Sequence, residues 1–408
     1  MLPRRDEKKL IKLCRIIYEF PPSIGGSITH TLELATHMAP YCERQIFIVP
    51  KIKQNTSEID ANLPFEVCRI KYLEFNWLKG IKSKYFKYLP IAPLINFSFS
   101  ISALNKCWLL KRQYGLDMVH VHGINFGPTA TMWRYLAKIP VVIMIDGSQE
   151  SYSHLAGIFE TMLIKLTNLD HYFVVDNGGP ALLKFKRLLH DQSKLTPVFI
   201  NLDTSKLYPK PKNIELTKRL GLNNCFVFIS IHNLEPIQGV EYSILGFKYF
   251  IDQYNIKDAT LLIVGAGSIK NELEKMASEL KLNNRVIFVG AISNSLVIDY
   301  YSISDVALST SLKINMNTST IEAMACKKPV IAFDCGNTED LLIRHMQNGI
   351  LVSPGSIEEL SESMFLCYNK KELRISLGEN AREFVVNNRD WGKRIDSELG
   401  VYNKLLKD

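Results

Sequence analysis

One stretch, residues 309–355, limits most strongly what this chain can fold into. Its middle, IEAMACKKPVIAF, predicts a helix that ends at two lysines and a proline and then leads into a strand. The apolar run 330–333 has the length of a strand that is covered on both faces, as in a parallel sheet. The preceding polar sequence, INMNTST, could cap the helix through Thr318, Ser319 or Thr320. The start of such a helix suits an anion such as a diphosphate, because it offers unpaired N–H groups and the positive end of the helix dipole.

The same stretch resembles the nucleotide-sugar-binding segment of family 4 glycosyltransferases, the large retaining group with the two-domain GT-B fold. The family signature there is an acid, seven further residues, a glutamate, an Ala-Met-Ala-like helix and a Pro-Val-Ile strand. Glu322 matches the second acid, whereas Ile314 stands where the family has the first. The resemblance implies that Glu322 is a catalytic-site residue that binds ribose hydroxyls. Four residues next to Ile314 are expected to contact the donor: Asn315, Met316, Asn317 and Thr318.

The N-terminal part of the chain carries a second pattern that suits a phosphate. Residues 14–19 predict a strand, two prolines end it, and Gly25 and Gly26 form a turn before an amphipathic helix. Glycines let the backbone come close to a diphosphate. The pattern PP-x-x-GG-x-x-x-H resembles the N-terminal motif of the family, which implies that both glycines lie beside the ligand. His30 belongs to the same motif and either touches the ligand or packs within its helix.

Residues 117–123, DMVHVHG, predict a strand with two histidines at alternating positions, so that both side chains point to the same side. The segment resembles a strand end of the family in which the second histidine, here His122, faces the sugar near the reacting carbon. The alternative is a structural histidine at the end of a strand. A later strand runs into Asp146 and Gly147, where the family often has Thr-x-His-Gly.

A further apolar strand runs into HNLEPIQGV, which resembles a loop in which the family clamps the diphosphate with an arginine and a lysine. Here His232 or Asn233 stands at the arginine and Gln238 at the lysine. His232, which we count among the catalytic residues, could replace part of the lost charge if a diphosphate favours its protonated form. Asn233 and Gln238 donate only neutral hydrogen bonds, which are about half as strong. Val289 lies in a strand whose family counterpart holds the base through backbone groups.

The composition agrees with a two-domain cytoplasmic protein. A chain of 408 residues is long enough for two domains with sizeable cores. No apolar run is long enough to span a membrane, and the basic N-terminus lacks the apolar region and cleavage site of a signal peptide. The eight cysteines are scattered without a CxxC pair, which favours reduced, buried thiols and a cytoplasmic protein.

The charge favours anionic partners other than nucleic acid. The chain has 49 basic and 41 acidic residues, a net charge of +8 that is too small and too dispersed to indicate DNA or RNA binding. The segment from Tyr72 to Arg112 interleaves lysines with aromatic residues, which suits the interface of a membrane with acidic lipids. The segment therefore indicates peripheral contact with the inner face of a membrane. The alternative is a basic loop and a core helix that line the acceptor cleft.

We predict an α/β fold with two Rossmann-like, doubly wound parallel-sheet domains that face a cleft, as in GT-B proteins. Residues 1–207 are expected to form the acceptor-side domain and 208–385 the nucleotide-sugar-binding domain. Residues 386–408 are expected to form a helix that returns to the first domain.

The resemblance implies an enzyme that moves a hexosyl-type sugar from a nucleotide-diphosphate sugar to a glycan or lipid-linked acceptor with retention of configuration. We expect no cofactor besides this donor and no metal, because no cluster of metal ligands has suitable spacing. Two alternatives stay open. One is a catalytically impaired GT-B protein that binds nucleotide sugar or partners an active glycosyltransferase, and the other is a sugar-phosphate epimerase or phosphorylase on the same fold.

Overall fold

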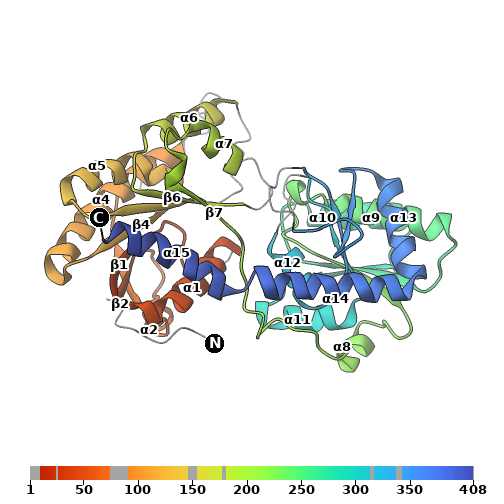
Figure 1. Ribbon diagram of the computed structural model, residues 1–408. Helices are drawn as coiled ribbons and strands as arrows, with labels where there is room; N and C mark the ends of the chain where they lie inside the picture. The colour runs from red at the N-terminus through yellow and green to blue at the C-terminus, as the bar shows by residue number, and fades with distance from the viewer. Residues whose placement is uncertain are drawn as a thin grey trace. The chain divides into compact units, whose positions relative to one another are not determined.

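The computed structural model describes residues 10–23, 26–73, 91–145, 154–176, 181–312, 317–336 and 342–407. The chain forms two compact units, each built on one parallel sheet (Figure 1). The first unit comprises Met1–Asp176, Pro180–Phe199 and Trp391–Asp408, and the second is chiefly Ile200–Asp390. The predicted pair of Rossmann-like parallel-sheet units is confirmed. The main boundaries between the units fall after residues 199 and 390, whereas the sequence predicts them after residues 207 and 385.

The first unit holds a seven-stranded sheet in the order β3-β2-β1-β4-β5-β6-β7, and all neighbouring strands run parallel. Every residue of β4, β5 and β6 is buried, because helices cover both faces of the sheet. The strands are β1 (Ile11–Ile16), β2 (Cys42–Pro50), β3 (Glu66–Ile70), β4 (Met118–His122), β5 (Val141–Ile145), β6 (His171–Val175) and β7 (Leu195–Val198). The first strand lies earlier than the predicted residues 14–19, because Ile11 and Leu13 also belong to the core.

The helices of the first unit are α1 (Gly26–Met38), α2 (Ser57–Ala61), α4 (Ile91–Tyr114), α5 (Gly127–Ala137), α6 (His154–Leu166), α7 (Ala181–Leu188) and α15 (Trp391–Leu405), with short 3₁₀ turns at Ala39–Tyr41, Ile124–Phe126 and Gln192–Lys194. Helices α4 to α7 cover one face of the sheet, where Cys14 and Ile16 of β1 point. Helices α1 and α15 cover the other face (Figure 1). On that side Arg15 of β1 pairs with Glu398 of α15. None of the helices in the described residues is apolar over a length that would cross a membrane.

The second unit holds a six-stranded parallel sheet in the order β10-β9-β8-β11-β12-β13. Its strands are β8 (Phe226–Ile231), β9 (Ala259–Val264), β10 (Val286–Gly290), β11 (Val306–Ser309), β12 (Val330–Phe333) and β13 (Ile350–Val352). The stretch 330–333 is a fully buried strand, as its apolar sequence predicts.

The helices of the second unit are α8 (Ile214–Arg219), α9 (Val240–Gln253), α10 (Lys270–Glu279), α11 (Asn294–Ile303), α12 (Thr318–Ala325), α13 (Ile357–Asn369) and α14 (Lys371–Asn388), with a 3₁₀ turn, η5, at Pro236–Gln238. Phe228 of β8 packs edge-on against Phe247 and Phe250 of α9, and all three side chains are fully buried. Edge-to-face contacts of this kind add to the burial of apolar area. This core holds the carboxyl ends of β8 and β11 in fixed positions.

Candidate active site

Each sheet has a point at which its strand order reverses. In the first sheet this point lies between β1 and β4, and in the second it lies between β8 and β11. Ligands of open α/β sheets bind beyond the carboxyl ends of the strands at such points. His122 is the last residue of β4, and His232 directly follows β8. These two predicted site residues therefore lie at the switch points of their own sheets.

Two loops meet at the switch point of the second sheet. Gly239, which ends the loop after β8, has a φ of +58°, and a Cβ atom there would lie 2.2 Å from the carbonyl oxygen of Thr310. The Thr310 hydroxyl is 2.9 Å from the hydroxyl of Ser243, and the Leu312 N–H donates to the Ile237 carbonyl at 3.3 Å. Glycine is needed at 239 because the backbone conformation and the close approach both exclude a side chain. The loop after β8 and residues 310–312, which directly follow β11, thus form one fixed surface.

Asn317 caps helix α12. Its side-chain oxygen accepts hydrogen bonds from the Thr320 N–H at 2.9 Å and from the Thr320 hydroxyl at 2.6 Å. The prediction that Thr318, Ser319 or Thr320 caps this helix is therefore wrong. Asparagine is among the best N-cap residues, and Thr320 supplies a bond to the cap instead of forming it. The Asn317 oxygen is thus already engaged at the helix start, whereas the amide nitrogen lies 3.4 Å from the Ser309 hydroxyl.

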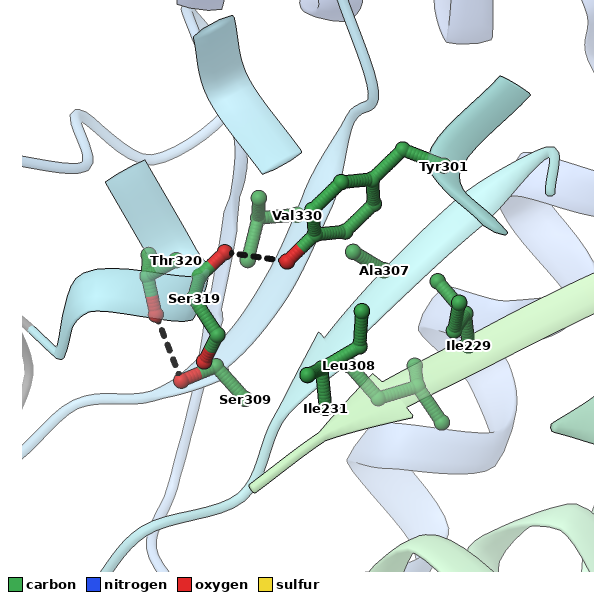
Figure 2. A pocket seen from close by; sticks show the side chains of 9 residues that line it. All are labelled: Ile229, Ile231, Tyr301, Ala307, Leu308, Ser309, Ser319, Thr320 and Val330. Carbon is green, nitrogen blue, oxygen red and sulfur yellow. Dashed lines mark hydrogen bonds between the residues drawn. The ribbon is translucent and has the colours of Figure 1, made fainter. Parts of the chain in front are cut away.

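A pocket lies behind the first turn of α12 (Figure 2). The Tyr301 hydroxyl points toward this turn and donates to the Ser319 carbonyl at 2.8 Å, while the Ser309 and Thr320 hydroxyl oxygens lie 2.9 Å apart. The other lining residues are apolar and come from β8, β11 and β12: Ile229, Ile231, Ala307, Leu308 and Val330. Burial, followed by the charge of Glu322, raises the pKa of Tyr301 well above its ordinary value. The Tyr301 hydroxyl therefore keeps its proton and acts here as a donor.

The predicted clamp residues differ in their solvent exposure. Asn233 is exposed and Gln238 is partly buried, whereas His232 is buried. Burial lowers the pKa of His232 to about 4, and the Leu308 backbone and the Gln238 side chain oppose that effect. His232 is therefore neutral at pH 7, and a charged role would require an anion that raises its pKa to 7 or above. Asn233 is the most exposed of the three predicted clamp residues.

The remaining predicted residues of the second unit lie in three places. Glu322 is partly buried in α12, and its charge, after burial, raises the pKa of Cys326 to about 12. Val289 is partly buried near the end of β10, and Thr318 is the first residue of α12. Asn315 and Met316 lie outside the described residues, as does Ile314. In the parts of the chain that the structure describes, no three His, Cys, Asp or Glu side chains are grouped so that they could hold a metal ion.

The N-terminal motif is described only in part. Gly25 lies outside the described residues, as do Asp146 and Gly147, and Gly26 is the first residue of α1. His30, on the same helix, packs its ring 4.9 Å from the ring of Trp391 at the start of α15. Burial, followed by the charge of Arg394, lowers the pKa of His30 to about 3. His30 is therefore a neutral ring that packs against the C-terminal helix.

The two histidines of β4 lie on the same side, as their alternating positions predict. Their rings stack at 4.8 Å, and both side chains are buried. Arg15 contacts both, with Nη1 at 3.1 Å from Nδ1 of His120 and at 3.4 Å from Nε2 of His122. Sequence reasoning missed Arg15 and its partner Glu398. A signal was present in the sequence, because IKLCRI carries two basic residues, Lys12 and Arg15, in an otherwise apolar strand.

The second unit contains the part of the chain that a known family matches. Residues 214–384 match the family described as Glycosyl transferases group 1. This segment is therefore similar to glycosyl transferases of group 1. The resemblance inferred from the stretch around Glu322 is confirmed at this level, and the segment includes the loops after β8 and β11 as well as α12.

Similar proteins extend the likeness to the rest of the chain. N-acetyl-alpha-D-glucosaminyl L-malate synthase of Bacillus anthracis is 23% identical over 401 residues, which are 95% of this chain and 96% of the relative. Alpha-monoglucosyldiacylglycerol synthase of Acholeplasma laidlawii is 25% identical over 288 residues, 66% of this chain and 71% of the relative. The crystal structure of Anabaena Alr3699/HepE in complex with UDP has a TM-score of 0.75 at 18% identity and covers 96% of this chain and 98% of that one. The fold is the GT-B type that the sequence predicts.

Proposed function

We propose that this protein is a glycosyltransferase that takes a hexosyl-type sugar from a nucleotide-diphosphate sugar and transfers it, with retention, to a glycan or lipid-linked acceptor. The observation that carries the proposal is the fixed surface at the switch point of the second sheet. There Gly239 locks the loop after β8 to the loop after β11, beside the capped start of α12. Such a surface offers backbone N–H groups to a diphosphate. A protein of the same fold was crystallised with UDP, which supports a uridine-linked donor.

In this proposal the second unit binds the donor. Asn233 and Gln238 meet the diphosphate, Val289 lies at the base, and Glu322 accepts hydrogen bonds from the ribose. In the same proposal the sugar of the donor contacts Asn315, Met316, Asn317 and Thr318. When the anomeric bond breaks, the leaving diphosphate gains negative charge, and stabilising that charge is the main catalytic task. His122, at the switch point of the first sheet, faces the sugar near the reacting carbon.

A second candidate is a catalytically impaired protein that binds nucleotide sugar or partners an active glycosyltransferase. The observation that favours it is the lack of charge at the clamp positions, where Asn233 is exposed and His232 has a pKa of about 4. Loss of one charge-stabilising contact typically costs on the order of 10² to 10³ in rate. Binding would then persist while turnover falls.

Two measurements separate these candidates. The melting temperature in the presence of a panel of nucleotide-diphosphate sugars identifies the donor, because a ligand that binds the folded state stabilises it. Hydrolysis or transfer of that donor then tests turnover. Turnover supports the enzyme, and binding without turnover supports the impaired protein. A panel in which no donor raises the melting temperature contradicts the enzyme and the form of the second candidate that binds nucleotide sugar.

A pair of substitutions tests whether the clamp is a weakened form of the family's own. Asn233→Arg and Gln238→Lys would return an arginine and a lysine to the positions that carry them in the family. We expect the double variant to transfer sugar faster than the natural chain by 10-fold or more, since charged hydrogen bonds are about twice as strong as neutral ones. An unchanged rate in a variant that binds donor more tightly would show that these positions do not meet the transition state.

We extend the proposal to a cytoplasmic protein that contacts the inner face of a membrane through part of the segment from Tyr72 to Arg112. Residues 74–90 lie outside the described residues, but α4 exposes Trp108 and Leu109 next to Lys111 and Arg112. Exposed aromatic and cationic side chains side by side suit a surface of acidic lipids. Sedimentation with vesicles of phosphatidylglycerol tests this, with phosphatidylcholine vesicles as the control. Equal binding to both, or to neither, contradicts the proposed contact.

A further inference from the structure

A charged side chain lies in the interior of the first unit. Arg15 stands in the middle of β1 and is fully buried, between β2, β4 and the C-terminal helix α15. A buried guanidinium is costly unless its N–H groups find partners and a negative charge balances it. The partners of Arg15 show what this position does.

Each nitrogen of Arg15 faces a different group. Nε donates to the Gln45 side-chain oxygen at 3.1 Å, and Gln45 is itself oriented by the bond of its amide nitrogen to the Ala35 carbonyl at 2.9 Å. Nη1 lies 3.1 Å from Nδ1 of His120 and 3.4 Å from Nε2 of His122. Nη2 forms an ion pair with Oε2 of Glu398 at 3.5 Å. The planar fork therefore has a fixed orientation in the unit.

The contact with Arg15 determines where the proton of His122 resides. A guanidinium has N–H donors and no acceptor, so the ring nitrogen that faces it must accept. Nε2 of His122 is that nitrogen, and the neutral ring then carries its proton on Nδ1. Charged and titratable groups face His122 from three elements, namely Arg15 on β1, Arg394 on α15 and His30 on α1. Burial and these neighbours hold the pKa of His122 well below its ordinary value, so the ring stays neutral at pH 7.

The C-terminal helix supplies the negative charge that balances Arg15. Glu398 is fully buried, and it pairs with Arg394 at 2.6 Å and accepts the hydroxyl of Tyr402 at 2.8 Å. The Tyr402 hydroxyl also lies 2.7 Å from Nδ1 of His120. Glu398 is thus held on two sides by its own helix while it faces Arg15.

We propose that Arg15 is a positioning residue for His122: it donates to Nε2 and fixes the neutral ring with the proton on Nδ1. Glu398 holds Arg15 in place, so α15 helps to prepare the switch point of the first sheet. The inference rests on the proposed function in one respect, that His122 faces the sugar. It deepens that function, because His122 then meets its ligand as a neutral hydrogen-bond donor through Nδ1 and neither as a cation nor as a general base at that atom.

Nitrogen-15 NMR of protein labelled in its nine histidines tests the tautomer directly and does not require turnover. The signals of His122 are identified by their loss in His122→Gln. We expect a neutral ring protonated on Nδ1 from pH 5 to pH 8. A ring protonated on Nε2, or one that becomes doubly protonated near pH 6.5, overturns the proposal even if the variants below fail to fold.

Arg15→Met removes the donor and leaves Glu398 with Arg394 and Tyr402 as partners. The double variant Arg15→Met with Glu398→Gln also removes the carboxylate that pairs with Arg15. In either variant we expect a mixture of tautomers at His122 and a pKa closer to the ordinary value. Arg134→Met is the matched control, because Arg134 of α5 pairs with Asp170 at 2.7 Å, and Asp170 directly precedes β6. If the tautomer of His122 is the same in all of these variants, Arg15 has a structural role only.

Activity supplies a second readout once a donor is known. We expect Arg15→Met to lower kcat by about 10- to 100-fold, the usual cost of removing a group that orients a functional histidine, with little change in the KM of the donor. A loss confined to KM contradicts the positioning role. If no donor turns over, the proposed function fails while the tautomer measurement still decides the proposal on Arg15.

Discussion

Replacing His232 by glutamine tests whether the histidine next to the donor loop is buried in its neutral form. Burial lowers the pKa of His232 to about 4 in the folded protein, whereas the ordinary value is 6.5. The folded pKa lies below the unfolded one, so the unfolded chain holds a proton between these values that the folded unit lacks. Stability from this group is therefore complete above pH 6.5 and is lost as the pH falls toward 4.

The size of the effect follows from the two pKa values. One site with a pKa of 6.5 in the unfolded chain and about 4 in the folded unit lowers the free energy of unfolding by about 2 kcal/mol between pH 7 and pH 4.5. His232→Gln removes this site and leaves the other titrating groups in place. The difference in unfolding free energy between the natural chain and the variant should therefore fall by about 2 kcal/mol over that range.

Urea unfolding at several pH values measures this difference. All four tryptophans belong to the first unit, so far-UV circular dichroism reports on both units and tryptophan fluorescence on the first alone. Unfolding of the second unit is then measured as the change in circular dichroism that occurs without a matching change in tryptophan fluorescence. His345→Gln, at an exposed histidine of the same unit, controls for the loss of one imidazole. A difference that stays constant from pH 7 to pH 4.5 would refute the neutral, buried state of His232.

Three further substitutions test the packing of the second unit by urea unfolding. Gly239→Ala should cost about 2 kcal/mol or more, because alanine is strained at a φ of +58° and its Cβ would lie 2.2 Å from the Thr310 carbonyl oxygen; a cost below about 0.5 kcal/mol would show that the loop adapts. Asn317→Ala should cost about 0.5 to 2 kcal/mol through loss of the helix cap, and Asn317→Asp should retain most of the stability; equal losses would count against capping. Phe250→Ala should cost about 3 to 5 kcal/mol, because the side chain is fully buried; a smaller loss would indicate that the core collapses around the gap.

The sequence predicts the fold of both units because local patterns carry it. The apolar run 330–333 correctly predicted that β12 is a buried strand. The alternating histidines of β4 correctly predicted that both rings lie on the same side of that strand. The start of β1 was misplaced because the basic residue Lys12 interrupts its apolar pattern, while pairing with β2 and β4 extends the strand across it. Propensity is local, and the partners that override it come from other parts of the chain.

The candidate site could be predicted only where one motif holds all of its parts. The loop after β8 was found, but the burial of His232 depends on how that loop folds back on the sheet, which no local pattern records. The pairing of Arg15 with Glu398 joins opposite ends of the chain and was not predicted. A single sequence shows a charged residue in a strand, and only the folded unit shows what it meets.

The C-terminal helix has a consequence for how the protein is made. The second unit is one nearly continuous segment, Ile200–Asp390, whereas the first needs Trp391–Asp408 to be complete. During translation the second unit therefore has its full sequence before the first does, the reverse of the usual N-to-C order. Until the residues of α15 leave the ribosome, the nascent N-terminal half lacks Glu398, the counter-ion of Arg15 in β1. Synthesis that stops before residue 391 would release one unit with its sequence complete and one that still awaits its final helix.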